Sequence, residues 1–299
     1  MAIDFTKSCD ESGSNYGIKG CQSEIAELIK PFKVDPSLSL DTATSDLDQA
    51  ALDVLICEGK VEALPEGVFT SNAEENVRAT QGNAGILRPV RDGLFAGNFS
   101  FIEGATCLGN KLANLKNKKW GLWFADANGK LIVNRTSDGF VKPFFTSFVD
   151  KGTTQYNDGS NVTQYSLDFQ LSKAGNRAWN ENVDVYDGGI DWDQVQGVND
   201  TNLTVTVDGS DISLTAILGR DGSTQVANQE NNFRVIDTAT NAPTNPVFTY
   251  DATSGAYATT GLSAGSYTIE FYDTVNSCSI VKDSEGCYYA SNTATFTIV

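Results

Sequence analysis

The chain has 299 residues, of which 40% are hydrophobic and 10% aromatic, so it can bury sizeable cores and is not largely disordered. At roughly 150 residues per domain, this length favours two domains. The formal net charge of −17 repels nucleic acid and anionic lipid, which argues against specific DNA binding and against a membrane partner.

The absence of histidine removes a large part of enzyme chemistry. Ser-His-Asp and Cys-His nucleophiles, histidine general bases and histidine-containing metal sites are all excluded. The phosphate-binding motif GxxxxGK[ST] is also missing. We therefore expect a protein that is not an enzyme, with no catalytic residue, no cofactor and no metal site.

Two short helices are expected in the first part of the chain, up to about residue 60. The N-terminal segment MAIDFTKSCDESGSNYG shows no basic n-region and no apolar h-region, so we expect no secretory signal there. In QSEIAELIKPF, apolar residues recur at helical spacing until Pro31. A second helix is expected between Ser45 and Leu55, with Gly59 as its C-terminal cap.

From about residue 61 to 187 the pattern changes to the period of two that is typical of strands. The segment GKLIV follows the turn DANG, and YSLDFQLS alternates apolar and polar residues. The stretch VKPFFTSFV is apolar on both faces, because Phe144, Phe145 and Phe148 cannot all point one way. These three phenylalanines are therefore our candidate oligomer interface.

A domain boundary is predicted near DWDQVQGVNDTNLTV, where Gly, Asn and Asp accumulate after Trp192. We divide the chain into residues 1–198 and 199–299. Seven short strands separated by turns in the second part match an immunoglobulin-like sandwich. The expected strands are Leu203–Val207, Ser213–Leu218, Phe233–Asp237, Val247–Tyr250, Tyr257–Thr260, Ser266–Tyr272 and Thr293–Val299.

An acidic run, DVYDGGIDWD, is the strongest candidate for ligand chemistry. Carboxylates crowded on a glycine-rich loop can bind Ca²⁺ or act as a glycosidase pair. An acidic linker between domains is the alternative, and we favour it. The four carboxylates of the run are Asp184, Asp187, Asp191 and Asp193.

Six cysteines are too sparse for a disulfide-built scaffold in a chain of this length. Cys278 and Cys287, nine positions apart, bracket the polar turn KDSEG in an expected β-hairpin. They are the one pair placed to meet across strands, with their Cα atoms within about 7 Å of each other. In a reducing cell we expect both to stay thiols.

Two resemblances suggest a function. The segment GLSAGSYTIEFYD resembles the penultimate strand of many bacterial and phage immunoglobulin-like domains. The succession GILRPVRDGLFAGNFSFIEG, KKWGLWFADANGKLIVNRTSDGFVKPFFTSFV and YSLDFQLSKAGNRAWNENVDVYD resembles phage tail tube and related virion proteins. The fold that these resemblances imply is mainly β, an N-terminal β-sandwich or barrel domain with short flanking helices followed by an immunoglobulin-like sandwich.

The tail tube resemblance also implies partners and a location. Copies of the chain would join into a hexameric ring, and stacked rings would form a tube through which DNA passes without specific binding. The assembly domain would be residues 1–198, with residues 199–299 as an exposed decoration. Other virion proteins would be further partners, and assembly would take place in the bacterial host cytoplasm. The alternative is a carbohydrate-binding adhesin, a receptor-binding protein or a capsid decoration protein.

Overall fold

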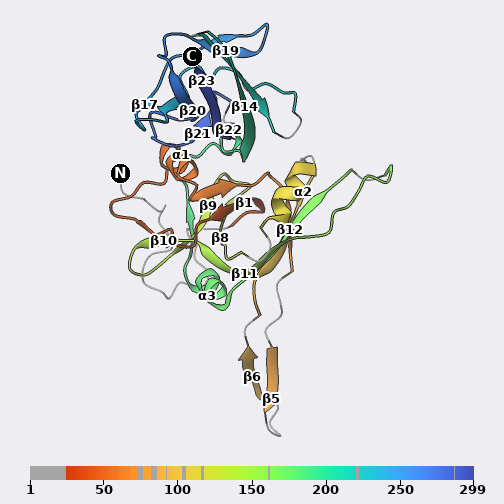
Figure 1. The fold of residues 1–299 in the computed structure, drawn as a ribbon. Helices are drawn as coiled ribbons and strands as arrows, with labels where there is room; N and C mark the ends of the chain where they lie inside the picture. The colour runs from red at the N-terminus through yellow and green to blue at the C-terminus, as the bar shows by residue number, and fades with distance from the viewer. Residues whose placement is uncertain are drawn as a thin grey trace. The chain divides into compact units, whose positions relative to one another are not determined.

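The structure, a computed structural model, describes residues 25–72, 77–81, 86–91, 93–102, 106–115, 118–160, 162–209, 211–219, 222–285 and 287–299. The chain folds as two compact units (Figure 1). The first comprises Met1–Leu52 and Lys60–Asp191, and the second comprises Asp53–Gly59 and Trp192–Val299. These bounds differ from the expected division at residues 198 and 199, because both 192–198 and a short segment from the N-terminal part belong to the second unit.

An eleven-stranded antiparallel sheet forms the body of the first unit. Its main path runs β2-β10-β9-β8-β11-β12-β7-β4, while β1 pairs with β3 and β8, and β13 pairs with β9. The sheet curls towards a barrel, since the amide of Gly67, just before β4, donates to the carbonyl oxygen of Ile29 in β1 (2.8 Å). The strands are β1 Leu28–Val34, β2 Leu40–Asp41, β3 Val61–Ala63, β4 Val68–Ser71, β7 Ala96–Phe101, β8 Gly121–Asp126, β9 Leu131–Arg135, β10 Phe140–Lys142, β11 Phe144–Lys151, β12 Tyr165–Leu171 and β13 Val183–Tyr186.

Aromatic rings fill the core inside this curled sheet. Phe124 is the central ring, with centroids 5.5 Å from Phe169, 6.0 Å from Phe99 and 6.3 Å from Phe144. Trp179 adds an edge-on contact to Phe124 at 5.8 Å. The core is therefore built from inward-facing residues of strands that are distant in sequence, which is the pattern that period-two alternation predicts.

Three helices lie in the described part of the chain: α1 Gln49–Cys57, α2 Thr106–Ala113 and α3 Lys173–Glu181. The expected helix between Ser45 and Leu55 is confirmed as α1, and Gly59 follows it with φ +67°. Helices α2 and α3 were not expected, because a glycine interrupts the helical pattern of each. The side chain of Ser172 caps α3 by accepting from the amide of Gly175 (3.0 Å).

The prediction of a helix in QSEIAELIKPF is wrong. Residues Leu28–Val34 form strand β1, which pairs with β8 in the register Phe32 to Trp123. The apolar residues of this segment satisfy a helical period and a strand equally well over so short a run. The segment forms a strand because both of its edges then pair with a neighbour: one edge of β1 pairs with β8 and the other with β3.

Replacing Gly175 in α3 with alanine is expected to destabilise the first unit by about 1–3 kcal/mol, although alanine is the better helix former. A Cβ atom at this position would collide with the backbone carbonyl oxygen of Phe145 in β11. Asn180→Ala, at an exposed position of the same helix, is the matched control and should be neutral or slightly stabilising. Urea denaturation of both variants measures the difference, and equal stability would contradict this account of the helix contact.

The expected hairpin around DANG is confirmed. Strands β8 and β9 are joined by a turn in which Gly129 has φ +79°. The buried carboxylate of Asp126 accepts from the amides of Asn128 (3.0 Å) and Lys130 (2.9 Å). Asp126 therefore closes the turn, as the Asx geometry of such hairpins requires.

The second unit is a sandwich of two sheets with a shared core. One sheet has the order β18-β19-β15-β14-β22-β21 and the other β17-β16-β20-β23. Leu214 from the first sheet and Val235 and Ile269 from the second all lie in the common core. The strands are β14 Val198–Asp208, β15 Asp211–Leu218, β16 Phe233–Asp237, β17 Pro243–Thr244, β18 Thr249–Asp251, β19 Ala256–Thr259, β20 Gly265–Phe271, β21 Ile280–Lys282, β22 Tyr288–Ser291 and β23 Ala294–Ile298, with a 3-10 turn at Trp192–Gln194.

The immunoglobulin-like sandwich expected from the sequence is confirmed. All seven expected strands overlap observed ones, and β16 has the expected bounds. The segment GLSAGSYTIEFYD contains β20, and the Tyr267 hydroxyl donates to the carbonyl oxygen of Ser263 four residues upstream (2.9 Å). This hydrogen bond is the tyrosine-corner interaction of immunoglobulin-like sandwiches.

Candidate functional site

The best candidate for an interaction surface is one face of the strands β11, β12, β7 and β4. Successive residues of a strand point to opposite faces, and directly paired residues share a face. The inward face of these strands carries core residues such as Phe99 and Phe169. The opposite face, here called the open face, is half-buried or exposed at most positions and consists of Phe148, Asp150, Ser166, Asp168, Gln170, Asn98, Ser100, Val68 and Thr70.

Polar side chains on the open face are tied together across the strands. The amide of Asn98 in β7 donates to the carboxylate of Asp168 in β12. Asp150 of β11 is the direct register partner of Asp168 on the other side. Ser100 donates to the side chain of Asn98 (3.0 Å). This ladder gives the open face a polar and acidic centre, and like charges directly opposite each other oppose burial against an apolar partner.

The structure separates the three candidate interface phenylalanines. Phe144 is fully buried in the core of its own unit, where its ring lies 5.1 Å from that of Trp179. Phe145 is half-buried, and its carbonyl oxygen accepts from the amide of Ser172 at the start of α3 (2.9 Å). Phe148 is 44% exposed on the open face. Of the three, Phe148 has the most exposed side chain, and it is therefore the best placed to contact another molecule.

A β-bulge explains why Phe148 points outward. Thr146 pairs with Leu171, but the next register pair is Phe148 with Gln170, so Ser147 is an extra residue. The Ser147 hydroxyl donates to the carbonyl oxygen of Gln170 (3.1 Å), which holds the bulge in place. The bulge shifts the alternation by one position, so Val149 enters the core and Phe148 joins the open face.

The acidic run does not gather its four carboxylates at one point. Asp184 lies in β13 and forms an ion pair with Arg135 (3.2 Å), whereas Asp193 lies in the 3-10 turn. Asp187 and Asp191 are exposed between these elements. Within the described residues, no group of three or more Cys, Asp or Glu side chains is arranged to hold a metal ion. Asp184 therefore has a structural role, because its ion pair with Arg135 links β13 to the neighbouring strand β9.

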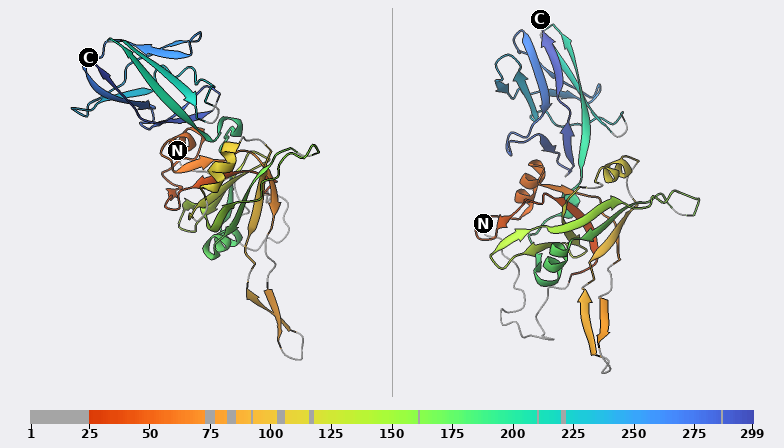
Figure 2. Two further views of the ribbon diagram at one scale, coloured as in Figure 1. Left: turned by 45° about the vertical axis from the view of Figure 1, so that its right-hand side comes forward. Right: turned by 60° about the horizontal axis from the view of Figure 1, so that its bottom comes forward.

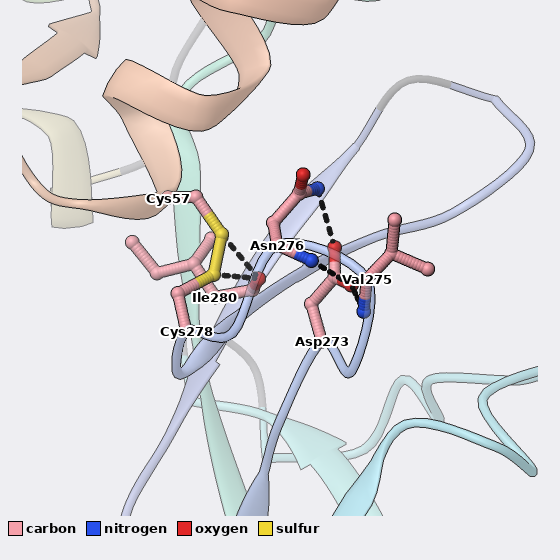
Figure 3. The surroundings of a disulfide bond; sticks show 6 residues. All are labelled: Cys57, Asp273, Val275, Asn276, Cys278 and Ile280. Carbon is pink, nitrogen blue, oxygen red and sulfur yellow. Dashed lines mark hydrogen bonds between the residues drawn. A yellow bond between two sulfur atoms is a disulfide. The ribbon is translucent and has the colours of Figure 1, made fainter.

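A disulfide in the second unit joins Cys57, at the end of α1, to Cys278 (Figure 3). Their Cα atoms are 5.8 Å apart, and 221 positions separate them in sequence. Cys278 follows a tight turn that begins at Asp273. In this turn the carboxylate of Asp273 accepts hydrogen bonds from the backbone amides of Val275 (2.8 Å) and Asn276 (3.0 Å). The two sulfur atoms lie 3.5 and 3.2 Å from the carbonyl oxygen of Ile280, which can accept from either thiol when the pair is reduced.

An ion pair supports the same attachment. Lys282 in β21 contacts both carboxylate oxygens of Asp53 in α1 (2.9 and 3.0 Å), and the hydroxyl of Tyr288 donates to Asp53. Burial and the neighbouring Asp53 carboxylate raise the pKa of Tyr288 far above its usual value, so this hydroxyl keeps its proton. The segment Asp53–Gly59 is therefore held to the sandwich by both a covalent bond and a charged cluster.

The expected approach of Cys278 and Cys287 is wrong, although the hairpin that contains them is present. In the observed register Ile280 pairs with Ala290. Beside the turn, the backbone amide of Asp283 donates a hydrogen bond to the carbonyl oxygen of Cys287 (3.0 Å). Cys278 thus lies five positions from the residue opposite Cys287, or about 16 Å along a strand. Cys287 stays outside any disulfide, and its thiol donates to the side chain of Gln196 (3.3 Å).

Comparison with known proteins adds no further identification. No protein-family model matches the sequence, and no curated protein matches it. In the part of the chain that the structure describes, no helix has the length and apolar character needed to cross a membrane.

Proposed function

We propose that the chain is a self-assembling structural protein of a virion, most specifically a phage tail tube subunit. The observation that carries this proposal is the open face, where a bulge fixed by Ser147 holds Phe148 towards solvent. In such an assembly the first unit makes the contacts between copies. The immunoglobulin-like unit is then an exposed decoration, and the alternation of its strands already buries its own core.

The energetics of Phe148 favour a contact between copies. Fully burying an exposed phenylalanine side chain contributes about 1.5–3 kcal/mol. Phe148 is 44% exposed, so covering the rest of its side chain contributes roughly 1 kcal/mol per contact, and a closed ring repeats the contact in every subunit. A hexameric ring stacked into a tube is the geometry that the tail tube resemblance implies. The polar remainder of the open face tolerates water, so Phe148 serves as an apolar anchor within a wet interface.

The acidic balance of the chain suits a conduit for DNA. Cationic walls bind DNA by releasing its counterions, whereas a protein of net charge −17 lets the polymer pass without specific binding. Other virion proteins would be the remaining partners. The protein would assemble in the bacterial host cytoplasm and end in the virion.

Phe148→Asp is expected to abolish assembly of the full chain while leaving its fold intact, because an aspartate cannot be buried in an apolar contact. Light scattering and negative-stain microscopy measure the particle size, and the melting temperature reports the fold. Val275→Asp is the control, since it adds the same charge in place of an exposed apolar side chain of the second unit. This control should assemble as the wild type does.

The alternative functions give different results in the same experiment. A wild-type chain that stays monomeric up to high concentration and binds glycans on an array is a carbohydrate-binding adhesin or receptor-binding protein. A monomer that binds only preformed capsids is a decoration protein. Assembly of Phe148→Asp into particles of wild-type size would show that Phe148 is not the anchor.

A further inference from the structure

The two sulfur atoms of the disulfide Cys57–Cys278 differ in their access to solvent. Cys57 ends α1 and is only 8% exposed, whereas Cys278 lies on a loop and is half-buried (Figure 3). The loop residues on either side of Cys278, Ser277 and Ser279, are exposed. A disulfide opens when a thiolate attacks one of its sulfur atoms, and the rate depends on access to that atom. A small thiol therefore attacks this disulfide at Cys278.

The same surroundings suit the two cysteines in their reduced form. Both sulfur atoms lie against one backbone acceptor, the carbonyl oxygen of Ile280, which is 3.5 Å from Cys57 and 3.2 Å from Cys278. A thiol set free by reduction thus has a hydrogen-bond acceptor at its present position. The thiol of Cys287 donates to the side chain of Gln196 and lies too far along its hairpin to exchange with Cys278. The pair can therefore open and close without a rearrangement of its neighbours.

A charged cluster keeps the two cysteines close together without help from the disulfide. Asp53 precedes Cys57 by four residues, so the two side chains lie on the same side of α1, one turn apart. The Asp53 carboxylate accepts from Lys282 (2.9 and 3.0 Å) and from the hydroxyl of Tyr288. Lys282 follows Cys278 by four residues, in β21. The side chains of this ion pair are only 21% and 23% exposed, so water screens their attraction less than that of a surface pair.

We propose that Cys57 and Cys278 form a reversible redox switch, in which Cys278 exchanges with small aliphatic disulfides and Asp53 positions Cys57. In the first step the Cys278 thiolate attacks the small disulfide, forms a mixed disulfide and releases one small thiolate. In the second step the Cys57 thiolate attacks the Cys278 sulfur and expels the other small thiolate. The two cysteines thus lose two electrons to the small disulfide, and their two protons pass to the two released thiolates. An excess of small thiol reverses both steps.

The first test brings the full chain to equilibrium with mixtures of reduced and oxidised glutathione. Peptide mapping gives the fraction of chains that carry the Cys57–Cys278 bond, and hence the effective concentration of one cysteine at the other. Asp53→Asn keeps the shape of the side chain but removes the ion pair with Lys282. We expect this variant to lower the effective concentration by about fivefold or more, because α1 is then held less firmly. Lys282→Gln removes the same ion pair from the other side and should give the same loss.

Asp211→Asn is the matched control, because it makes the same chemical change at an exposed position of the same unit. Asp211 pairs with Asp208 at one end of β14, whereas Tyr288 pairs with Val198 at the other end. β14, the long green strand in Figure 2, has 11 residues and so separates the two ends by about 33 Å. This control should have the effective concentration of wild type. Melting temperatures of the reduced proteins show whether each variant folds.

The second test asks which sulfur atom reacts first. In the reduced Cys57→Ser and Cys278→Ser variants, only one cysteine of the pair remains to form a mixed disulfide with oxidised glutathione. We expect Cys278 to react at least about tenfold faster than Cys57, because Cys57 is nearly buried. Mass spectrometry of the peptides measures both rates, and Cys287 in the same chains serves as the internal reference.

Three results would overturn the inference. Equal effective concentrations in wild type and in both ion-pair variants reject Asp53 as a positioning residue. A faster reaction at Cys57 than at Cys278 reverses the proposed order of attack. A wild type that forms no Cys57–Cys278 bond in excess oxidised glutathione rejects the switch as a whole. None of these measurements depends on self-assembly, so a failure here is distinguishable from a failure of the proposed function.

Discussion

Phe124→Ala is expected to lower the free energy of unfolding of the first unit by about 3–5 kcal/mol. Phe124 is fully buried at the centre of the aromatic core, and its ring contacts those of Phe99, Phe144 and Phe169. Truncation removes both the burial of the ring and these contacts, and leaves a cavity that the rigid strands cannot close. Urea denaturation followed by tryptophan fluorescence measures the loss, since three of the four tryptophans lie in this unit.

Phe148→Ala is the control for this prediction. It removes the same side chain from the same sheet, but from the open face, where Phe148 is 44% exposed. The monomer should lose no more than about 1 kcal/mol. Similar losses for the two variants would mean that Phe148 also belongs to the core and is not available to a neighbour.

Cys57→Ser is expected to lower the stability of the oxidised second unit by about 2–5 kcal/mol. The disulfide closes a loop in which 221 positions separate the two cysteines, so its loss releases a long segment of the unfolded chain. The ion pair of Asp53 with Lys282 stays, so α1 should not detach completely. Calorimetry of the variant and of the wild type without reductant measures the difference.

Two comparisons separate the disulfide from a simple change of side chain. Wild type with excess reductant should have the same melting temperature as the Cys57→Ser variant. The Cys287→Ser variant should have the melting temperature of the oxidised wild type, because Cys287 lies outside the disulfide. Peptide mapping without reduction identifies the bonded pair directly. A Cys278–Cys287 bridge in that map would contradict the structure.

Strand positions were predictable where the chain alternates strictly and a turn is marked by its own residues. Asp126 and Gly129 define one hairpin, because the aspartate bonds to the amides of the turn and the glycine adopts a positive φ. The segment around Tyr267 identified a sandwich strand for the same local reason. Prediction failed in a segment without such markers. A helix ending at Pro31 was expected in QSEIAELIKPF, but pairing with β8 makes Leu28–Val34 a strand.

The candidate interface was only partly accessible to sequence reasoning. The motif VKPFFTSFV indicates phenylalanines on both faces of a strand, but it does not say which one is outside. That choice depends on the bulge at Ser147, which is stabilised by Gln170 on the neighbouring strand. The sequence could not supply this pairing, since β11 and β12 are joined by a long hairpin whose register is set by core packing.

What the sequence by itself determined is the fold class, the immunoglobulin-like character of the second part and the acidic charge, because alternation, turn residues and composition are local properties. What only the tertiary structure decided is which distant residues meet. Cys278 forms its disulfide with Cys57 and not with Cys287, which is closer in sequence. The register of the hairpin places Cys287 several residues along the strand from Cys278, and the turn at Asp273 places Cys278 next to Cys57. Contacts between residues far apart in sequence depend on how whole elements pack, and no local pattern encodes them.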